Sequence, residues 1–151
     1  MEELQHCEIL KTNINVTNMS DTIKYIDGHL DDLRGKYICV SNVHTTVMSY
    51  ENEEYRKIQN GAAMALPDGA PLSSYSRRKG YKQAQRVTGP DLMLELFAIS
   101  KEKGYRHYFY GATEETLQSM KEVLERDYPG IQIAGMYAPP FRALTPQEDA
   151  Q

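Results

Sequence analysis

The sequence has few of the features that mark a secreted or membrane-spanning protein. It has two cysteines, Cys7 and Cys39, and both lie in apolar runs, which favours reduced thiols in a protein core. No apolar run is long enough to cross a bilayer, and the acidic start, Met1-Glu2-Glu3, is unlike a secretion signal. We therefore expect a cytoplasmic protein.

The sequence also lacks the motifs of common nucleotide and metal sites. It contains no Gly-x-Gly-x-x-Gly, no P-loop and no Asp-x-Asp pair, so an oxidoreductase that binds a dinucleotide is a weak interpretation, and we expect no cofactor and no metal. The net charge of -4 at pH 7 argues against binding to nucleic acid through neutralisation of its phosphates.

Strand-like and helix-like segments alternate along the 151 residues, and we find no repeat or low-complexity linker. The length suits a single α/β domain over residues 1–151. Apolar runs predict strands at 7–16, 36–41, 62–66, 105–110 and 131–136. Helical spacing and cap residues predict helices at 20–35, 49–59, 71–78, 90–103 and 113–126. This alternation predicts a Rossmann-like fold, in which a mostly parallel sheet has helices on both faces.

Two further expectations concern burial. The continuous apolar run at 36–41 is typical of a strand that is buried on both faces. In the helix predicted at 90–103, helical spacing places Leu92, Met93, Leu96 and Ile99 on the inward face.

Polar residues follow four predicted strand exits. They are Asn42-Val43-His44, Asp68-Gly69, Arg86 with Gly89-Pro90-Asp91, and Gly111-Ala112-Thr113. Because the carboxyl ends of parallel strands meet at one edge of a sheet, these groups are expected to converge on one ligand. The glycines and helix starts favour an anion, and Arg86 can clamp a phosphate. The pattern predicts a phosphorylated, nucleotide-linked ligand.

Each of these residues also has a purely structural interpretation. Asp68 lies in a Pro-Asp-Gly turn and could cap the helix that follows. A histidine such as His44 is more often a hydrogen-bonded structural residue, and Arg86 alone is more often a surface charge or half of a salt bridge. The functional hypothesis depends on the structure bringing these residues together.

Five motifs together resemble one family of enzymes. They are Ser41-Asn42-Val43-His44, Pro67-Asp68-Gly69-Ala70-Pro71, Arg86-Val87-Thr88-Gly89-Pro90-Asp91-Leu92, Phe109-Tyr110-Gly111 and Tyr128-Pro129-Gly130-Ile131. In this order and spacing they resemble the WecG/TagA/CpsF family of glycosyltransferases, from about residue 36 onward. The stretches His44-Thr45-Thr46 and Ala138-Pro139-Pro140-Phe141-Arg142 most resemble the CpsF-like branch, which makes capsular polysaccharide.

The resemblance implies an inverting hexosyltransferase of cell-surface polysaccharide synthesis. Such an enzyme moves an N-acetylmannosamine-type sugar or related hexose from a UDP-sugar to a sugar on undecaprenyl pyrophosphate. The family's base falls on Asp68, its polar strand exit on Asn42, and its Arg-x-x-Gly-x-Asp turn on Arg86, Gly89 and Asp91. With His44, Gly69 and Gly111 from the other strand exits, these residues form the predicted substrate-binding set.

The sequence departs from the family pattern in two places. Val40 stands where the family usually has a threonine, and the segment that normally follows the Thr145-Pro146-Gln147-Glu148 capping box is not present. We therefore expect the N-terminal portion of a longer glycosyltransferase domain, peripheral at the inner face of the cell membrane in its full-length form. Apolar surface left uncovered predicts a homo-oligomer. The alternative is a non-catalytic α/β module that binds a nucleotide-sugar or a partner protein.

Overall fold

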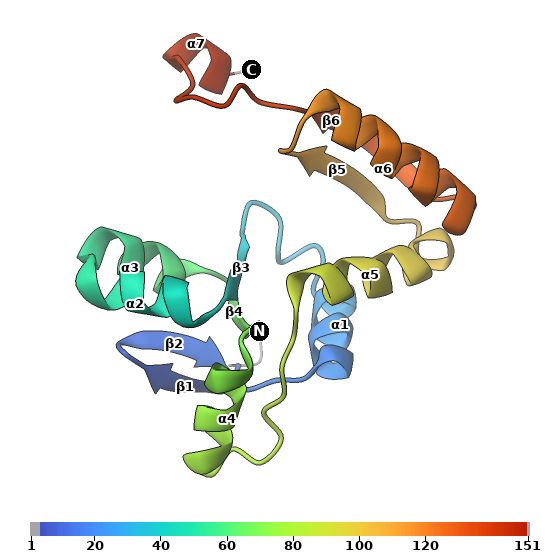
Figure 1. Ribbon diagram of the computed structural model, residues 1–151. Coiled ribbons are helices and arrows are strands. Elements are labelled where there is room, and N and C mark those ends of the chain that lie inside the picture. The colour runs from blue at the N-terminus through green and yellow to red at the C-terminus, as the bar shows by residue number, and fades with distance from the viewer. Residues whose placement is uncertain (1–3, 151) are drawn as a thin grey trace. The chain divides into compact units, whose positions relative to one another are not determined.

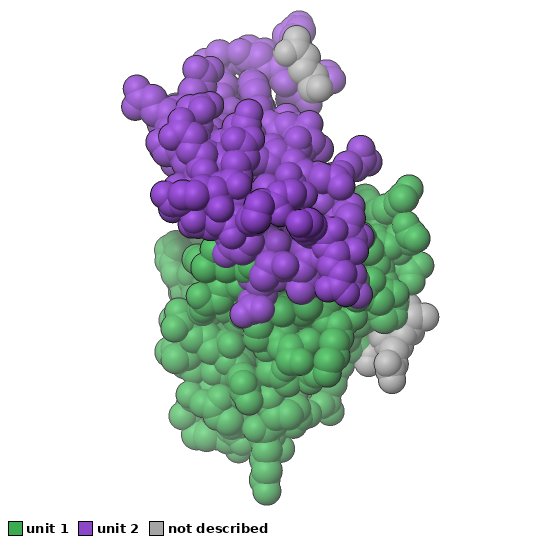
Figure 2. All heavy atoms as spheres, turned by 90° about the vertical axis from the view of Figure 1, so that its right-hand side faces the viewer, with its two compact units in different colours: residues 1–94 green, residues 95–151 purple. Residues whose placement is uncertain are grey.

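The computed structural model describes residues 4–150 and divides into two units, Met1–Leu94 and Glu95–Gln151, coloured separately in Figure 2. The boundary falls inside one helix, α5 (Gly89–Lys103). Each unit is described by itself. That the two units form one folding domain stays a prediction.

The first unit begins with a β-hairpin. Strands β1 (His6–Ile9) and β2 (Thr12–Asn15) pair antiparallel, and the chain reverses at Leu10 and Lys11, whose φ angles are 48° and 67°. The prediction of one strand over residues 7–16 is therefore wrong. Two-residue hairpin turns with positive φ normally contain Asn-Gly or Asp-Gly, and Leu-Lys gives no such indication.

Helix α1 (Met19–Gly28) follows the hairpin. Its N-cap is Asn18, whose Oδ1 accepts a hydrogen bond from the backbone N–H of Asp21 at 3.0 Å. The helix predicted over residues 20–35 is too long, because the helix stops at Gly28 and the chain continues in turns to Gly35. Glycine weakens a helix. A further turn would gain little burial from Leu30, the next apolar residue, because this side chain is 47% exposed.

A parallel pair of strands forms the middle of the first unit. Strands β3 (Ile38–Ser41) and β4 (Met64–Pro67) are connected through helices α2 (Val43–Glu51) and α3 (Glu53–Gly61), which pack against each other (Figure 1). The single helix predicted at 49–59 is two helices. They divide at Asn52, whose side chain caps α3 by accepting from the Tyr55 N–H at 3.0 Å.

The two strands of this pair differ in burial. Every residue of β4 is buried, whereas in β3 only Ser41 is buried and Val40 is 38% exposed. The prediction that this strand is buried on both faces is wrong. Gly89 lies against Val40 and has no side chain to cover it.

Helix α4 (Ala70–Arg78) follows β4, and residues 79–88 lead into α5. Within α5, Leu92 is buried and Leu96 and Ile99 are half-buried, as predicted, but Met93 is 43% exposed. The buried face of the helix instead includes Phe97 and Ser100.

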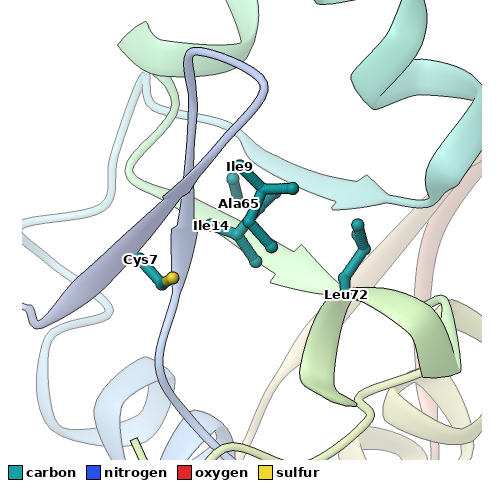
Figure 3. Close-up of a cluster of buried hydrophobic side chains, with 5 residues drawn as sticks. All are labelled: Cys7, Ile9, Ile14, Ala65 and Leu72. Carbon is teal, nitrogen blue, oxygen red and sulfur yellow. The ribbon is translucent and has the colours of Figure 1, made fainter. Parts of the chain in front are cut away.

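The first unit has an aliphatic core, shown in Figure 3. The hairpin, β4 and α4 contribute its buried side chains, Cys7, Ile9, Ile14, Ala65 and Leu72. Cys7 is a free core thiol, as predicted. Cys39 is free and half-buried, and burial raises the pKa of its thiol, which makes it a poor nucleophile at neutral pH.

The second unit holds another parallel pair, β5 (Arg106–Tyr110) and β6 (Gln132–Tyr137), joined through α6 (Glu114–Asp127) (Figure 1). Thr113 caps α6, with its Oγ1 accepting from the Thr116 N–H at 3.2 Å, as predicted. The predicted capping box of Thr145 and Glu148 is also present, at the start of α7 (Pro146–Asp149). The core of this unit contains an aromatic cluster, with Phe97 packed edge-on against the rings of His107, Phe109 and Tyr128, and the buried Leu117 and Leu124 of α6.

The α/β class of the prediction is confirmed, with short parallel strand pairs flanked by helices. Within residues 4–150 the strands form three two-stranded sheets, of which the hairpin is antiparallel and the other two are parallel. None of the described helices combines the length and the apolar character needed to span a membrane.

Candidate active site

The carboxyl ends of β3 and β4 lie side by side. Ser41 and Pro67 are opposite each other in the parallel register, and the backbone N–H of Asp68 donates to the carbonyl of Ser41 at 2.9 Å. Asn42 and Asp68 therefore leave the strand pair at the same edge. This is the convergence that the parallel topology predicts for these two residues.

A third segment brings Arg86 to the same place. The backbone N–H of Val87 donates to the carbonyl of Pro67 at 2.9 Å, so the residue before it lies alongside Asp68. The Nε of Arg86 donates to the backbone carbonyl of Asp68, and its Nη2 lies 3.5 Å from Asp68 Oδ1. The guanidinium therefore holds both the backbone and the carboxylate of Asp68.

Both partners remain accessible to a ligand. The side chain of Asp68 is 26% exposed and that of Arg86 is 57% exposed. Since the salt bridge between them is long and open to water, it adds little to folding stability. What it provides is proximity, because it places a guanidinium beside a carboxylate that is partly exposed to solvent.

Asp68 does not cap the helix that follows it. The N-cap of α4 is Gly69, and that helix has no side-chain cap. The structural interpretation of Asp68 as a helix cap is therefore wrong. The structural interpretation of Arg86 as half of a salt bridge agrees with the geometry, and its partner is the predicted base.

Asn42 is fixed by a capping box at the start of α2. Its Oδ1 accepts from the Thr45 N–H at 3.0 Å, and its own N–H donates to Thr45 Oγ1 at 3.0 Å. A Cβ built on Gly69 would lie 3.6 Å from the Cα of Asn42 and 3.7 Å from the N of Val43. The N-termini of α2 and α4 are therefore adjacent. Two adjacent helix N-termini favour an anion.

The glycines at this edge leave space in the site. A Cβ on Gly69 would meet nothing closer than 3.6 Å, and one on Gly89 would meet Val40 at 3.4 Å, so protein packing does not force either residue to be glycine. A side chain there would nevertheless project beside Asn42 or Val40. This fits the prediction that a ligand approaches the backbone at these positions.

The remaining predicted residues lie in three different settings. His44 is exposed in the first turn of α2, and within the described part of the chain no hydrogen bond to its ring is found. Asp91 is exposed in the first turn of α5, where its N–H donates to Thr88 Oγ1 at 3.1 Å. Gly111 belongs to the second unit, with a φ of 129° that favours glycine. That Gly111 contributes to the same site as Asp68 stays a prediction.

Two linked hydrogen bonds support the exit of β3, and the sequence does not predict them. Behind Asn42, Ser41 Oγ donates to Gln59 Oε1 at 2.7 Å, and the Gln59 amide donates to the Tyr55 hydroxyl at 3.3 Å. This buried chain of polar groups ties α3 to the exit of β3. A serine at a strand end and a glutamine in a charged helix give no sequence pattern that pairs them.

Residues 4–150 contain no cluster of three or more His, Cys, Asp or Glu side chains that could hold a metal ion. At the shared exit of β3 and β4 the structure brings together the charged side chains of Asp68 and Arg86, beside the N-termini of α2 and α4.

Comparison with known proteins places this site in an enzyme family. The model of the WecG/TagA/CpsF glycosyl transferase family matches residues 7–151. The chain belongs to this family. The predicted family resemblance is thus confirmed, and it extends further toward the N-terminus than the motifs indicated.

The curated relatives share one printed name, N-acetylglucosaminyldiphosphoundecaprenol N-acetyl-beta-D-mannosaminyltransferase. The protein of Bacillus spizizenii is 32% identical over 107 residues, covering 71% of this chain and 42% of the relative. The Bacillus subtilis protein is 26% identical over 120 residues, covering 79% and 47%, and a Staphylococcus aureus protein is 22% identical over 129 residues, covering 84% and 51%. The chain spans about half the length of the relatives it matches. The narrower assignment to the capsular branch stays a prediction.

Proposed function

We propose that this chain carries the sugar-transfer site of an inverting glycosyltransferase. The enzyme moves an N-acetylmannosamine-type sugar from a UDP-sugar to a lipid-linked acceptor in cell-surface polysaccharide synthesis. The observation that carries this proposal is the pairing of Asp68 with Arg86 at the shared exit of β3 and β4, in a chain of a glycosyltransferase family. The acceptor class is taken from the printed name of the relatives.

In this proposal Asp68 is the general base. Its carboxylate takes the proton from the acceptor hydroxyl while that oxygen attacks the anomeric carbon of the donor sugar. The bond from the anomeric carbon to the phosphate oxygen breaks, and UDP leaves on the opposite face with the electron pair. Attack from one face and departure from the other invert the configuration. The contacts of Arg86 with the backbone carbonyl and the carboxylate of Asp68 keep a positive charge beside the base.

The same edge supplies groups for the donor's diphosphate. Arg86 is more than half exposed, so its guanidinium can contact a phosphate while it holds Asp68. The N-termini of α2 and α4 offer backbone N–H groups beside Asn42 and Gly69. Positive groups placed where the leaving diphosphate gains charge lower the barrier to its departure. In this scheme His44, Gly89, Asp91 and Gly111 complete the contacts to substrate.

The proposed reaction also sets the cellular location. A polyprenyl diphosphate acceptor lies in the membrane while UDP-sugars are water-soluble, so the enzyme works at the cytoplasmic face of the membrane. We also propose that this chain associates with itself as a homo-oligomer.

A transfer assay tests this function. The protein is mixed with UDP-N-acetylmannosamine and an N-acetylglucosaminyl diphospholipid, and the product is analysed by mass spectrometry and NMR. We expect a disaccharide-lipid whose new linkage has the anomeric configuration opposite to that of the donor. Retained configuration would exclude the single displacement at Asp68. Tight UDP-sugar binding without any transfer by a full-length form would instead support the non-catalytic binding module.

A further inference from the structure

Three tyrosines stand on one face of the β5–β6 strand pair. Tyr110 and Tyr137 are opposite each other in the parallel register, and their ring centroids are 5.7 Å apart. Tyr108 is on the same face as Tyr110, because side chains alternate along a strand. The residues of β5 between and before them contact Phe97 in the core. We call the opposite surface, formed by Tyr108, Tyr110 and Tyr137, the tyrosine face.

The tyrosine face is open to solvent. Tyr108 and Tyr110 are 61% and 62% exposed, and Tyr137 is 39% exposed. Within residues 4–150 none of the three phenol hydroxyls makes a hydrogen bond to another residue. Parallel strands normally have both faces covered, and a contiguous exposed apolar surface marks a place where something binds. The three rings and their hydroxyls are therefore available to a ligand.

The residue opposite Tyr108 is a glycine that makes room for its ring. A Cβ built on Gly135 would lie 2.5 Å from Cε2 and 2.9 Å from Cδ2 of the Tyr108 ring, which is too close for a real side chain. The φ of Gly135 is not in the left-handed region, so the backbone does not require glycine here. The ring of Tyr108 thus lies over β6 in the place that a side chain at position 135 would take.

Residues 144–149 turn the tyrosine face into a cavity of about 450 Å³, which Leu144, Glu148 and Asp149 line together with the three tyrosines. Arg142 donates to both oxygens of Glu148 at 2.7 and 2.8 Å. These hydrogen bonds lower the pKa of Glu148 to about 2, so this carboxylate is ionised and fixed. The carboxylate of Asp149 makes no hydrogen bond or ion pair with any residue of the described chain. The cavity therefore combines aromatic surface, one fixed carboxylate and one free carboxylate.

This combination suits a neutral sugar ring better than an ion. Two carboxylates repel a phosphate, and the guanidinium of Arg142 is already engaged by Glu148. A cation is best held by rings on several sides of it, whereas the rings of Tyr110 and Tyr137 lie next to each other on one sheet face, with 42° between their planes. A pyranose has C–H groups on its faces and hydroxyls around its rim. It can lie on phenol rings while its hydroxyls bond to phenol and carboxylate oxygens.

We propose that the tyrosine face, with Glu148 and Asp149, binds a neutral pyranose. An enzyme that builds polysaccharide meets such rings in its acceptor and in its product. The cavity volume lies within the range of about 300–1,000 Å³ that is common for small-molecule sites. This site goes beyond the proposed transfer reaction, because it supplies affinity for a sugar, takes no part in proton transfer, and does not depend on Asp68 being the base.

Titration with the methyl glycoside of N-acetylglucosamine tests the site, followed by the NMR signals of the tyrosine rings. We expect the signals of Tyr108, Tyr110 and Tyr137 to shift. The glycoside should bind at least tenfold more tightly than sorbitol, which has the hydroxyls but no ring. Tyr110→Ala should weaken glycoside binding at least fivefold. Tyr50→Ala, which removes a 50% exposed tyrosine from α2, should not change it.

A second variant keeps all three rings. Gly135→Ala pushes the ring of Tyr108 out of its place, so it should weaken glycoside binding about threefold to tenfold, and circular dichroism of the same sample verifies the fold. Equal glycoside affinity in the wild type, Tyr110→Ala and Gly135→Ala would overturn the proposal. Absence of tyrosine shifts in the wild type at tens of millimolar glycoside would overturn it without any variant.

Asp149→Asn separates a sugar from a cation. Asparagine still accepts a hydrogen bond from a hydroxyl, so glycoside affinity should fall less than threefold. Tetramethylammonium that binds more tightly than the glycoside, and loses this affinity in Asp149→Asn, would show a cation site and overturn the proposal. Tyrosine shifts that follow protein concentration and not glycoside would assign the face to a second copy of the chain and overturn it as well.

UDP binding on the same samples distinguishes this proposal from the proposed function. UDP shifts near Asp68, with no glycoside shifts on the tyrosine face, would reject only the sugar site. Glycoside shifts on the tyrosine face without any UDP binding would support the sugar site and count against the transferase proposal.

Discussion

The two units use the ends of their parallel strands in different ways. In the first, the strand exits hold Asn42 and Asp68 at one edge, and Arg86 from a separate segment contacts Asp68. In the second, the exit of β5 is a backbone turn, with positive φ at Gly111 and Ala112 and a threonine cap for α6. Both are strand–turn–helix units. The two units differ in where the ion pair stands. In the first unit the carboxylate of Asp68 directly follows a strand, whereas in the second unit Arg142 pairs with Glu148 of α7, further along the chain from β6.

The cores of the two units differ as well. The first is built from aliphatic side chains and a thiol, and the second combines aromatic rings around Phe97 with the buried Leu117 and Leu124 of α6. The comparison shows that the α/β topology positions a site without creating one. The chemistry depends on which side chains stand at the strand ends. The following predictions probe the packing of the second unit and the candidate site of the first.

The largest effect is expected in the aromatic core. Phe97 is 5% exposed, and Phe97→Ala should lower the free energy of unfolding by about 3–5 kcal/mol, since it removes a large buried ring and leaves a cavity. Denaturant unfolding followed by circular dichroism measures the change. The matched control is Phe141→Ala, at a ring that is 94% exposed, where the change should stay within about 0.5 kcal/mol. Equal effects of the two variants would contradict the packing described for Phe97.

The next effect concerns ligand binding in the first unit. Arg86→Lys keeps the charge but loses the planar fork, so UDP binding should weaken by roughly 1–3 kcal/mol. Isothermal titration measures it, with Arg34→Lys as control because Arg34 pairs with Asp31 on an open surface. Unchanged UDP affinity in the Arg86 variant would limit Arg86 to holding Asp68.

Substituting one helix cap in each unit allows a direct comparison of the two units. Asn42 caps α2 and Thr113 caps α6, so Asn42→Ala and Thr113→Ala should each lower the free energy of unfolding by about 1 kcal/mol. Asn42→Ala should also weaken UDP binding, because that cap lies at the candidate site. Unchanged UDP affinity in the Asn42 variant would remove the N-terminus of α2 from the donor site.

The smallest expected effect is a pH dependence of stability in the second unit. Burial lowers the pKa of His107, so the folded protein favours the neutral imidazole, which hydrogen-bonds to Ser100. The unfolded chain takes up the proton first, and stability that is complete above the ordinary pKa of about 6.5 declines as the pH falls below it. In denaturant unfolding, His107→Gln should reduce this decline and the exposed His44→Gln should not. The reverse pattern would contradict the assignment.

Much of the fold could be predicted because turn-forming and helix-capping residues mark the ends of its strands and helices. The turn after Pro67, the cap at Thr113 and the capping box at Thr145 all lie where the sequence places them. The hairpin was missed because Leu10 and Lys11 occupy a turn that asparagine and glycine normally occupy. The division of α2 from α3 was missed because a single asparagine, Asn52, ends one charged helix and caps the next.

The candidate site was predictable in part for a topological reason. Parallel pairing alone places Asn42 beside Asp68, whereas the Arg86 contact depends on the backbone bond from Val87 to Pro67, which the sequence does not reveal.

The measurement that tests the central claim most directly is the transfer rate of Asp68→Asn in a competent full-length enzyme. The substitution keeps the size of the side chain and removes the base, so the rate should fall roughly 100- to 10,000-fold while the UDP dissociation constant stays close to that of the wild type. Asp32→Asn, at an exposed carboxylate in the turns after α1, should keep the wild-type rate. An Asp68→Asn protein that transfers sugar at nearly the wild-type rate would contradict the assignment of Asp68 as the base.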